Sequence, residues 1–242
     1  MTLSMTVLGC SGTYAGAGEA CSSYLVRSPG ANVVVDLGPG TLATLQEHTD
    51  LAALDALVLT HEHPDHWLEL PTLRNAMRYV LDLDGLTVLA TGGTWALART
   101  LLGDPAPPFR PVTVAAGATT VVGDQHLTFD RTDHPVETLA VRVDAGGRSL
   151  LYTADTGPAW DPAPLAGIDL LLAEATLTPE EEGRVQHLTG RQAGALAEAA
   201  RAGRLVLTHV APGVDREAQR AAARAVFRGP VEVARPHVTF AV

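Results

Sequence analysis

The sequence predicts an α/β (α+β) fold in which two β-sheets pack face to face and helices cover the outside. Strand-like stretches dominate residues 2–37 and 112–152, whereas helices and strands alternate in residues 41–102 and 168–241. This repeated order fits two packed sheets better than one doubly wound sheet. The 242 residues, 46% of them hydrophobic, can supply a sizeable core, and we treat 1–242 as a single domain.

The first half begins with strands and then alternates. Residues 2–8, 22–26 and 31–37 are strand-like, the last two forming a hairpin, and a Gly-Pro-Gly turn leads into a helix over about 41–48. Residues 54–60 are nearly all apolar, as in a strand covered on both faces. Pro71 can begin the next helix, whose predicted apolar stripe contains Leu73, Ala76, Met77, Val80 and Leu81.

The second half repeats this order. A strand at 86–90 and a helix at about 94–102 precede the proline-rich residues 104–111, which we expect to form a loop. Residues 112–152 predict a β-meander, and residues 168–172 and 205–208 predict buried strands. Thr189 and Gln192 form a capping box for a helix reaching about Ala202. A helix at about 215–227 and strands at 231–234 and 238–241 follow.

Composition excludes several classes of function. The net charge of −10, with no lysine, argues against charge-driven binding to extended nucleic acid or to an anionic membrane. Two cysteines are too few for a disulfide framework, and no signal-like or membrane-spanning apolar segment is evident. We therefore expect a cytoplasmic protein without membrane contacts, for which a homodimer is a compatible assembly.

Metal chemistry is indicated by the hexapeptide at residues 61–66. His61, His63, Asp65 and His66 are good metal ligands, and Pro64 opposes a regular helix, so alternate imidazoles can point the same way. His134, Asp155 and His209 also follow predicted strands, where a rigid sheet can hold active-site groups. Five imidazoles and two carboxylates suffice for two divalent ions, most simply Zn²⁺, with Mn²⁺ or Fe as alternatives.

This ordered set of motifs, with Asp36 upstream, resembles the metallo-β-lactamase superfamily over nearly the whole chain. The resemblance implies a four-layer αββα sandwich of two mixed sheets. It also implies that His61, His63 and His134 hold one metal, that Asp65, His66 and His209 hold the other, and that Asp155 bridges them beside a nucleophilic hydroxide. Asp36 is similar to the family's aspartate that orients the histidine loop.

Glu174 and His187 narrow the resemblance to the ribonuclease Z-like phosphodiesterases. In that branch the glutamate orients the histidine, which assists the leaving alkoxide. The resemblance thus gives catalytic roles to Glu174 and His187, and to Asp65 together with its role as a ligand. A poor leaving group needs such general acid catalysis, typically ~10²–10⁴-fold. The residues alone also allow Glu174 and His187 to be a structural pair, and Asp36 to be a turn residue.

The lack of a long insertion between His134 and Asp155 narrows the range of expected substrates. Only 20 residues separate His134 from Asp155, which leaves no room for the tRNA-binding arm of ribonuclease Z. A small phosphodiester such as a cyclic nucleotide therefore fits better than tRNA 3′-end cleavage. The rival readings are a lactone, thioester or aryl sulfate hydrolase of the same fold, and a metal-bound sensor without turnover. His48, His126 and His237 match no motif.

Overall fold

The computed structural model describes residues 2–242 and contains two seven-stranded mixed sheets. In the first sheet the order is β14 (Thr239–Ala241), β1 (Ser4–Gly9), β2 (Ser23–Ser28), β3 (Ala31–Val35), β4 (Ala56–Leu59), β5 (Leu86–Ala90) and β6 (Phe109–Thr113). Strands β14 to β3 pair antiparallel, and β3 to β6 pair parallel.

The second sheet also has seven strands, with one antiparallel part and one parallel part. Its order is β13 (Val231–Val233), β12 (Arg204–Thr208), β11 (Leu170–Glu174), β10 (Arg148–Tyr152), β9 (Leu139–Ala145), β8 (Gln125–Arg131) and β7 (Thr119–Val122). Strands β10 to β13 are parallel, and β7 to β10 form the predicted antiparallel meander.

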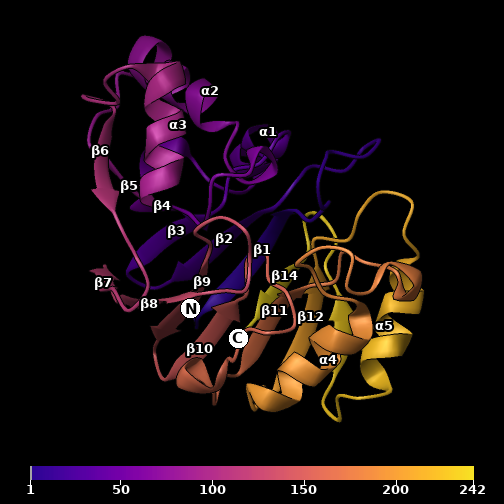
Figure 1. The fold of residues 1–242 in the computed structure, drawn as a ribbon. Coiled ribbons are helices and arrows are strands. Elements are labelled where there is room, and N and C mark those ends of the chain that lie inside the picture. The colour runs from indigo at the N-terminus through magenta and orange to yellow at the C-terminus, as the bar shows by residue number, and fades with distance from the viewer. Residues whose placement is uncertain (1) are drawn as a thin grey trace.

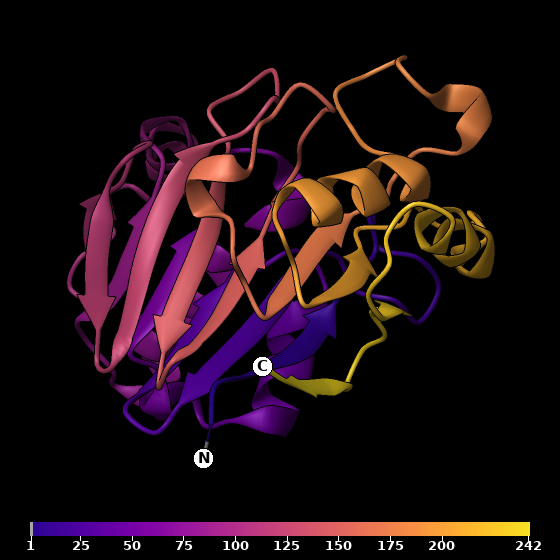
Figure 2. The ribbon, with the colours of Figure 1, turned by 90° about the horizontal axis from the view of Figure 1, so that it is seen from below.

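Helices cover the outer face of each sheet (Figures 1 and 2). Helices α1 (Thr41–His48), α2 (Leu70–Ala76) and α3 (Gly92–Leu102) pack on the first sheet through a core that includes Leu45, Leu73 and Trp95. Helices α4 (Gly190–Ala199) and α5 (Arg216–Arg224) pack on the second. A third apolar core lies between the sheets. The predicted αββα layering is confirmed.

Two local predictions are wrong. Residues 109–111 are not part of a loop, and Val112 and Thr113 are not part of the meander, because β6 pairs with β5 in the first sheet. Pro111 is tolerated because β6 is an edge strand. The apolar stripe of α2 also ends early: a π-helical turn at Met77–Leu81 widens the helix, and Val80 and Leu81 are 78% and 42% exposed.

The topology brings many strand ends to one edge of the sandwich. Strands β8, β10, β11 and β12 run in the same direction in the second sheet, and β3 and β4 run parallel in the first. Each of these strands ends in, or is followed by, one or more of the predicted site residues. Within residues 2–242 we find no helix long and apolar enough to cross a membrane.

Candidate active site

The histidine loop follows the buried strand β4. Its backbone is extended at His63, with φ −70° and ψ 139°, because Pro64 disfavours a helical conformation there. Pro64 then begins a short 3₁₀ turn, Pro64–His66, which turns Asp65 and His66 inward, so that both are buried. The loop therefore presents its imidazoles from an extended segment and its carboxylate from the turn, as the sequence predicts.

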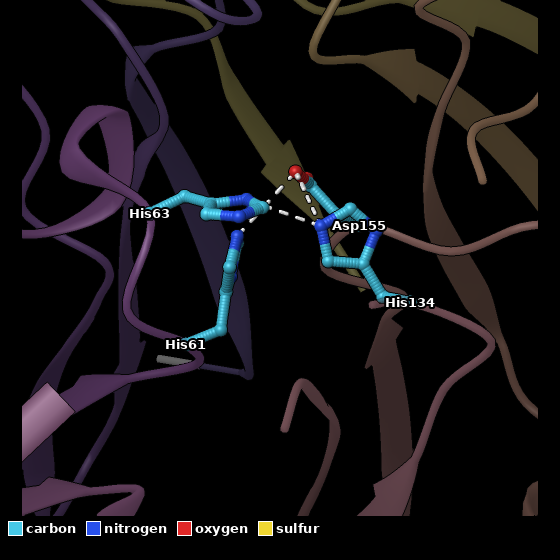
Figure 3. A group of neighbouring side chains, drawn as sticks. All are labelled: His61, His63, His134 and Asp155. Atoms are coloured by element: carbon cyan, nitrogen blue, oxygen red, sulfur yellow. Dashed lines mark hydrogen bonds and ion pairs between the residues drawn. The ribbon is translucent and has the colours of Figure 1, made fainter. Parts of the chain in front are cut away.

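The first donor group consists of His61, His63, His134 and Asp155, which each offer one atom within 4.8 Å of the others. His63 Nδ1 lies 3.1 Å from His134 Nε2, and His61 Nε2 lies 3.5 Å from Asp155 Oδ2. Figure 3 shows the four side chains converging on one point. Three nitrogens and one oxygen at this spacing match the ligand set of a tetrahedral zinc ion.

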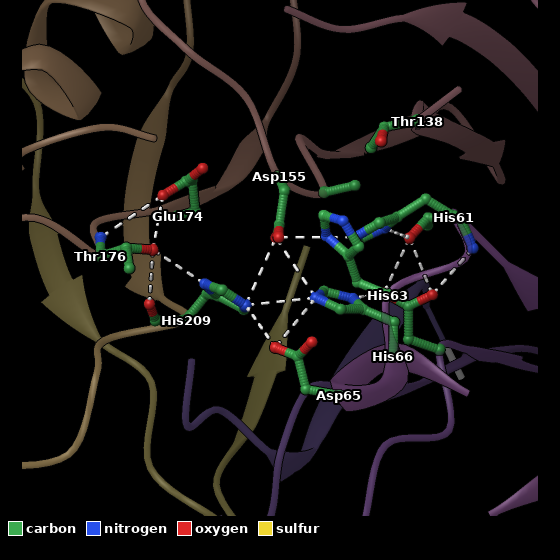
Figure 4. A network of polar contacts seen from close by, with 12 residues as sticks. His61, His63, Asp65, His66, Thr138, Asp155, Glu174, Thr176 and His209 are labelled. Atoms are coloured by element: carbon green, nitrogen blue, oxygen red, sulfur yellow. Dashed lines mark hydrogen bonds and ion pairs between the residues drawn. The ribbon is translucent and has the colours of Figure 1, made fainter. Parts of the chain in front are cut away.

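The second donor group consists of Asp65, His66 and His209, whose donor atoms also meet the 4.8 Å limit. His66 Nε2 and Asp65 Oδ2 each lie 3.2 Å from His209 Nε2. Asp155 faces both groups: its Oδ1 atom lies 3.3 Å from His66 Nε2 and 3.4 Å from His209 Nε2 (Figure 4). The two oxygens of Asp155 are thus directed to different donor groups, the geometry expected of a bridging carboxylate.

Two buried atoms at this point make no hydrogen bond, although other donor atoms of the cage lie 3.3–3.5 Å away. Among residues 2–242, no hydrogen bond is made by His61 Nε2 or by Asp155 Oδ1. Leaving such atoms unpaired in the interior is costly. Burial also lowers the pKa of His61 to about 4, which keeps the imidazole neutral as a metal ligand requires. Donor types, spacing and unpaired atoms therefore all fit divalent metal.

Asp36 holds the second donor group in place. It is fully buried, and its carboxylate accepts hydrogen bonds from His66 Nδ1 at 2.7 Å, from the Thr60 backbone N–H at 2.9 Å and from Tyr152 Oη at 3.1 Å. Because Nδ1 of His66 is occupied by Asp36, Nε2 is left to face the cage. This contact supports the orienting role that the resemblance implies for Asp36.

Glu174 connects His187 to the cage. Its Oε1 atom lies 2.8 Å from His187 Nδ1, and its Oε2 atom accepts from Thr176 Oγ1 at 2.6 Å. The same hydroxyl lies 2.8 Å from Nδ1 of His209. Burial opposes charge on His187, but the neighbouring Glu174 carboxylate outweighs it and raises the pKa of His187 to about 9. This shift favours the protonated form of His187.

A third set of donor atoms overlaps the other two. Asp155, His187 and His209 also bring one atom each within 4.8 Å. The raised pKa of His187 favours a proton donor there, since a metal ligand must be neutral. Geometry alone allows His187 to serve as either an acid or a ligand.

Several contacts at the site have little or no signal in the sequence. The backbone carbonyl of Gln186 lies 3.1 Å from His134 Nδ1, and the backbone N–H of Thr13 donates to Asp65 Oδ2 at 2.9 Å. Thr60 directly precedes the hexapeptide and Thr176 lies two residues after Glu174, so their positions could have suggested a role. Tyr152 ends a predicted strand and carries no such signal.

Among residues 2–242, three of the seven non-glycine residues with positive φ lie at the same place. Asp36, Ala154 and His209 adopt positive φ values of 59°, 50° and 51°. Non-glycine residues in this region cost of order 1–3 kcal/mol each and persist where the surroundings impose them. Each of the three either belongs to the cage or adjoins one of its residues, which is typical of a functional site.

A cavity of about 420 Å³ opens beside the cage. This volume is in the range of small-molecule sites. Its lining combines imidazoles, an acidic residue and apolar side chains: Thr13, His63, His134, Pro135, Thr176, Leu177, Glu181, Val185, Gln186, His187 and Ala211. No arginine is among these residues.

Comparison with known proteins identifies the family. The Beta-lactamase superfamily domain matches residues 31–210. The chain is 35% identical to the uncharacterized protein Rv1339 of Mycobacterium tuberculosis, covering 100% of this chain and 93% of that protein. It is 31% identical to the probable metallo-hydrolase YhfI of Bacillus subtilis, covering 96% and 97%. The chain therefore belongs to the β-lactamase superfamily, as a metallo-hydrolase.

Solved structures agree with this assignment. The metallo-β-lactamase fold protein YhfI from Bacillus subtilis superposes with a TM-score of 0.92 at 28% identity, covering 99% of both chains. A diphosphatase of the PhnP family superposes with a TM-score of 0.79 at 20% identity, covering 98% and 97%, which shows a shared fold. A further relative, the ribonuclease Z of Halorubrum lacusprofundi, is 28% identical and covers 95% and 94%.

Proposed function

We propose that the protein is a dinuclear metal-dependent phosphodiesterase that hydrolyses a small phosphodiester such as a cyclic nucleotide. The observation that carries this proposal is the 2.8 Å contact between Glu174 Oε1 and His187 Nδ1 at the edge of the metal cage, which favours a proton on the imidazole. A proton donor at this point is most useful to a reaction with a poor leaving group, such as a sugar hydroxyl. A ribonuclease and a diphosphatase among the similar proteins are named for hydrolysis at phosphorus.

The first donor group would hold one ion, the second would hold another, and Asp155 would contact both. Two such ions supply Lewis acidity: they lower the pKa of water and offset the charge that develops on phosphoryl oxygens. Zinc suits the nitrogen-rich donors best, with manganese or iron as alternatives.

Residues of the chain position the proton donor and the metal ligands. Glu174 fixes the ring of His187 through Nδ1, so that Nε2 is free to donate a proton to the leaving oxygen. Asp36 and Thr176 hold the rings of His66 and His209, so the cage keeps its shape during turnover. Asp65 accepts the Thr13 N–H, which fixes the carboxylate beside the cavity.

The cavity supports a compact substrate. Its lining offers Pro135, Leu177, Val185 and Ala211 to an apolar or aromatic group such as a nucleobase. The lack of arginine in the lining disfavours a substrate with several phosphates. The hairpin of strands β9 and β10 spans residues 139–152, which are 14 of the 20 residues between His134 and Asp155, so the fold has no arm for a tRNA body at that place.

A side-by-side substrate panel tests the proposal. Protein reconstituted with Zn²⁺ or Mn²⁺ is assayed on a cyclic nucleotide, an acyl lactone, a thioester, an aryl sulfate and a tRNA precursor. We expect the cyclic nucleotide to give the highest kcat/KM. A preference for the lactone, thioester or sulfate would show that the protein hydrolyses another class of ester. Cleavage of the tRNA precursor would show that it is a tRNA 3′-end endonuclease. Tight metal binding with no turnover on any substrate would favour a sensor.

A further inference from the structure

Two histidines outside the active site lie together in the fold. His48 and His237 are 189 residues apart, yet Nε2 of His48 lies 3.1 Å from Nδ1 of His237. Their ring centroids are 5.3 Å apart. Neither residue contacts the cage, and neither belongs to the motifs that define the family resemblance.

The backbone fixes this meeting from both sides. His48 is the last residue of α1, which packs on the first sheet. His237 precedes β14, and its backbone N–H donates to the Val7 carbonyl of β1 at 2.8 Å. His237 also has a left-handed backbone with φ 68°, which a side chain rarely adopts without a constraint. The pair is therefore anchored to one sheet through two different elements.

The spacing of the two nitrogens is that of a chelate. Two imidazole nitrogens at 2.0–2.1 Å from a tetrahedral zinc ion lie about 3.3 Å apart. The 3.1 Å separation of His48 Nε2 and His237 Nδ1 is close to this value. The Glu47 carboxylate is 3.8 Å from the same nitrogen of His237 and is exposed, so it can turn towards an ion.

The surrounding charges are mixed. Glu47 and the carbonyl end of α1 favour a cation, whereas Arg27, whose guanidinium donates to the His48 carbonyl, opposes one. Partial burial, with His237 and Arg27 nearby, lowers the pKa of His48. The neutral imidazole that results is the form that binds metal.

We propose that His48 and His237 form a third metal site, a surface chelate for Zn²⁺ or another borderline divalent ion such as Ni²⁺ or Cu²⁺, with Glu47 as its acidic neighbour. The site lies outside the catalytic cage and does not depend on the proposed function. An ion bound there would clamp the segment before β14 to the end of α1.

Zinc stoichiometry measured by equilibrium dialysis at pH 7.5 tests the proposal. The variants are His48→Ala, His237→Ala and, as a matched control, His126→Ala, which removes an exposed histidine from β8. Each is prepared in the wild-type chain and in Asp155→Ala, which disturbs the cage but not the surface pair. Far-ultraviolet circular dichroism establishes that every variant is folded.

In both backgrounds we expect His48→Ala and His237→Ala each to bind one equivalent less than their parent, and His126→Ala to match the parent. An unchanged count in either variant would overturn the chelate and leave a simple hydrogen bond between the two rings. An equal loss in His126→Ala would also overturn it, as general binding by surface histidines. Failure of the proposed hydrolase function would appear separately, as an inactive wild-type protein.

Discussion

The two donor groups of the cage differ in exposure and in support. In the second group His66 and His209 are buried, and their outer nitrogens are held by Asp36 and Thr176. In the first group His63 is only partly buried, and His63 and His134 line the cavity. We infer that the second group would hold an ion firmly, whereas the first group, which faces the cavity, would exchange an ion more readily.

The pKa values of the buried histidines also differ between the two groups. His61 of the first group is neutral, because burial lowers its pKa to about 4. For His66 of the second group, burial opposes charge, but Asp155 and Asp36 outweigh it and raise its pKa well above the usual value. An ion that binds to the second group must therefore displace a proton from His66. We therefore predict that metal binding to the better-supported group depends more strongly on pH than metal binding to the first group.

Asp155→Ala should have the largest effect, because it removes the residue that faces both groups. We expect kcat on an activated phosphodiester to fall by about 10⁴-fold or more, as the charge stabilisation supplied by two ions is worth several kcal/mol. Steady-state kinetics with saturating metal measures this loss. Retention of more than a tenth of the activity would mean that the two groups work independently.

His187→Ala tests whether His187 acts as a proton donor or as a metal ligand. We expect about 10²-fold loss on a diester with an alkoxide leaving group and a much smaller loss on a nitrophenyl ester, which needs no proton. Metal content should be unchanged. Equal losses on both substrates together with a lost equivalent of metal would make His187 a ligand of the third donor set.

Asp36→Asn tests the stronger support of the second group. Replacing the carboxylate by an amide weakens the hold on His66, and loss of such a partner typically costs 10–100-fold in metal affinity. We expect one of the cage ions to bind about 10-fold more weakly and the other to be unaffected, as measured by competition with a chelator. Glu62→Gln serves as the control, because Glu62 is a loop carboxylate outside both groups. Equal weakening of both ions would contradict the contrast between the groups.

The pH profile should show the smallest effect. The raised pKa of His187 means that its proton is present at neutral pH and is lost as the pH rises through about 9. Bound cations lower this pKa, so kcat on the alkoxide substrate should fall to about half at or below pH 9. In His187→Ala this alkaline decline should disappear, and a decline that persists would assign the titration to another group.

The sequence predicts which donor side chains lie together partly because the information in the histidine loop is local. His61, His63, Asp65 and His66 occupy six positions, and Pro64 alone fixes much of their geometry. Single histidines and acids such as His134 and Asp155 gain meaning from their order and from the strands before them. The contacts of Tyr152 with Asp36, and of the Gln186 carbonyl with His134, are long-range or made by backbone. Neither kind of contact leaves a pattern in the sequence.

The errors in the fold have similar causes. The predicted apolar stripe of α2 assumes 3.6 residues per turn throughout. The turn at Met77–Leu81 is π-helical, and it places Val80 in solvent. The sequence does not predict strand β6, because prolines are typical of loops, yet an edge strand tolerates Pro111. The sequence also does not reveal the pairing of His48 with His237, since only the packing of α1 against β1, which pairs with β14, brings them together.

The central claim is that two donor groups hold two ions with Asp155 between them. Anomalous X-ray diffraction from crystals grown with zinc tests it most directly. We predict two strong peaks about 3.5–4 Å apart, one among His61, His63 and His134 and one among Asp65, His66 and His209, both in contact with Asp155. A single peak, or a peak held by Asp155, His187 and His209 instead, would contradict the account.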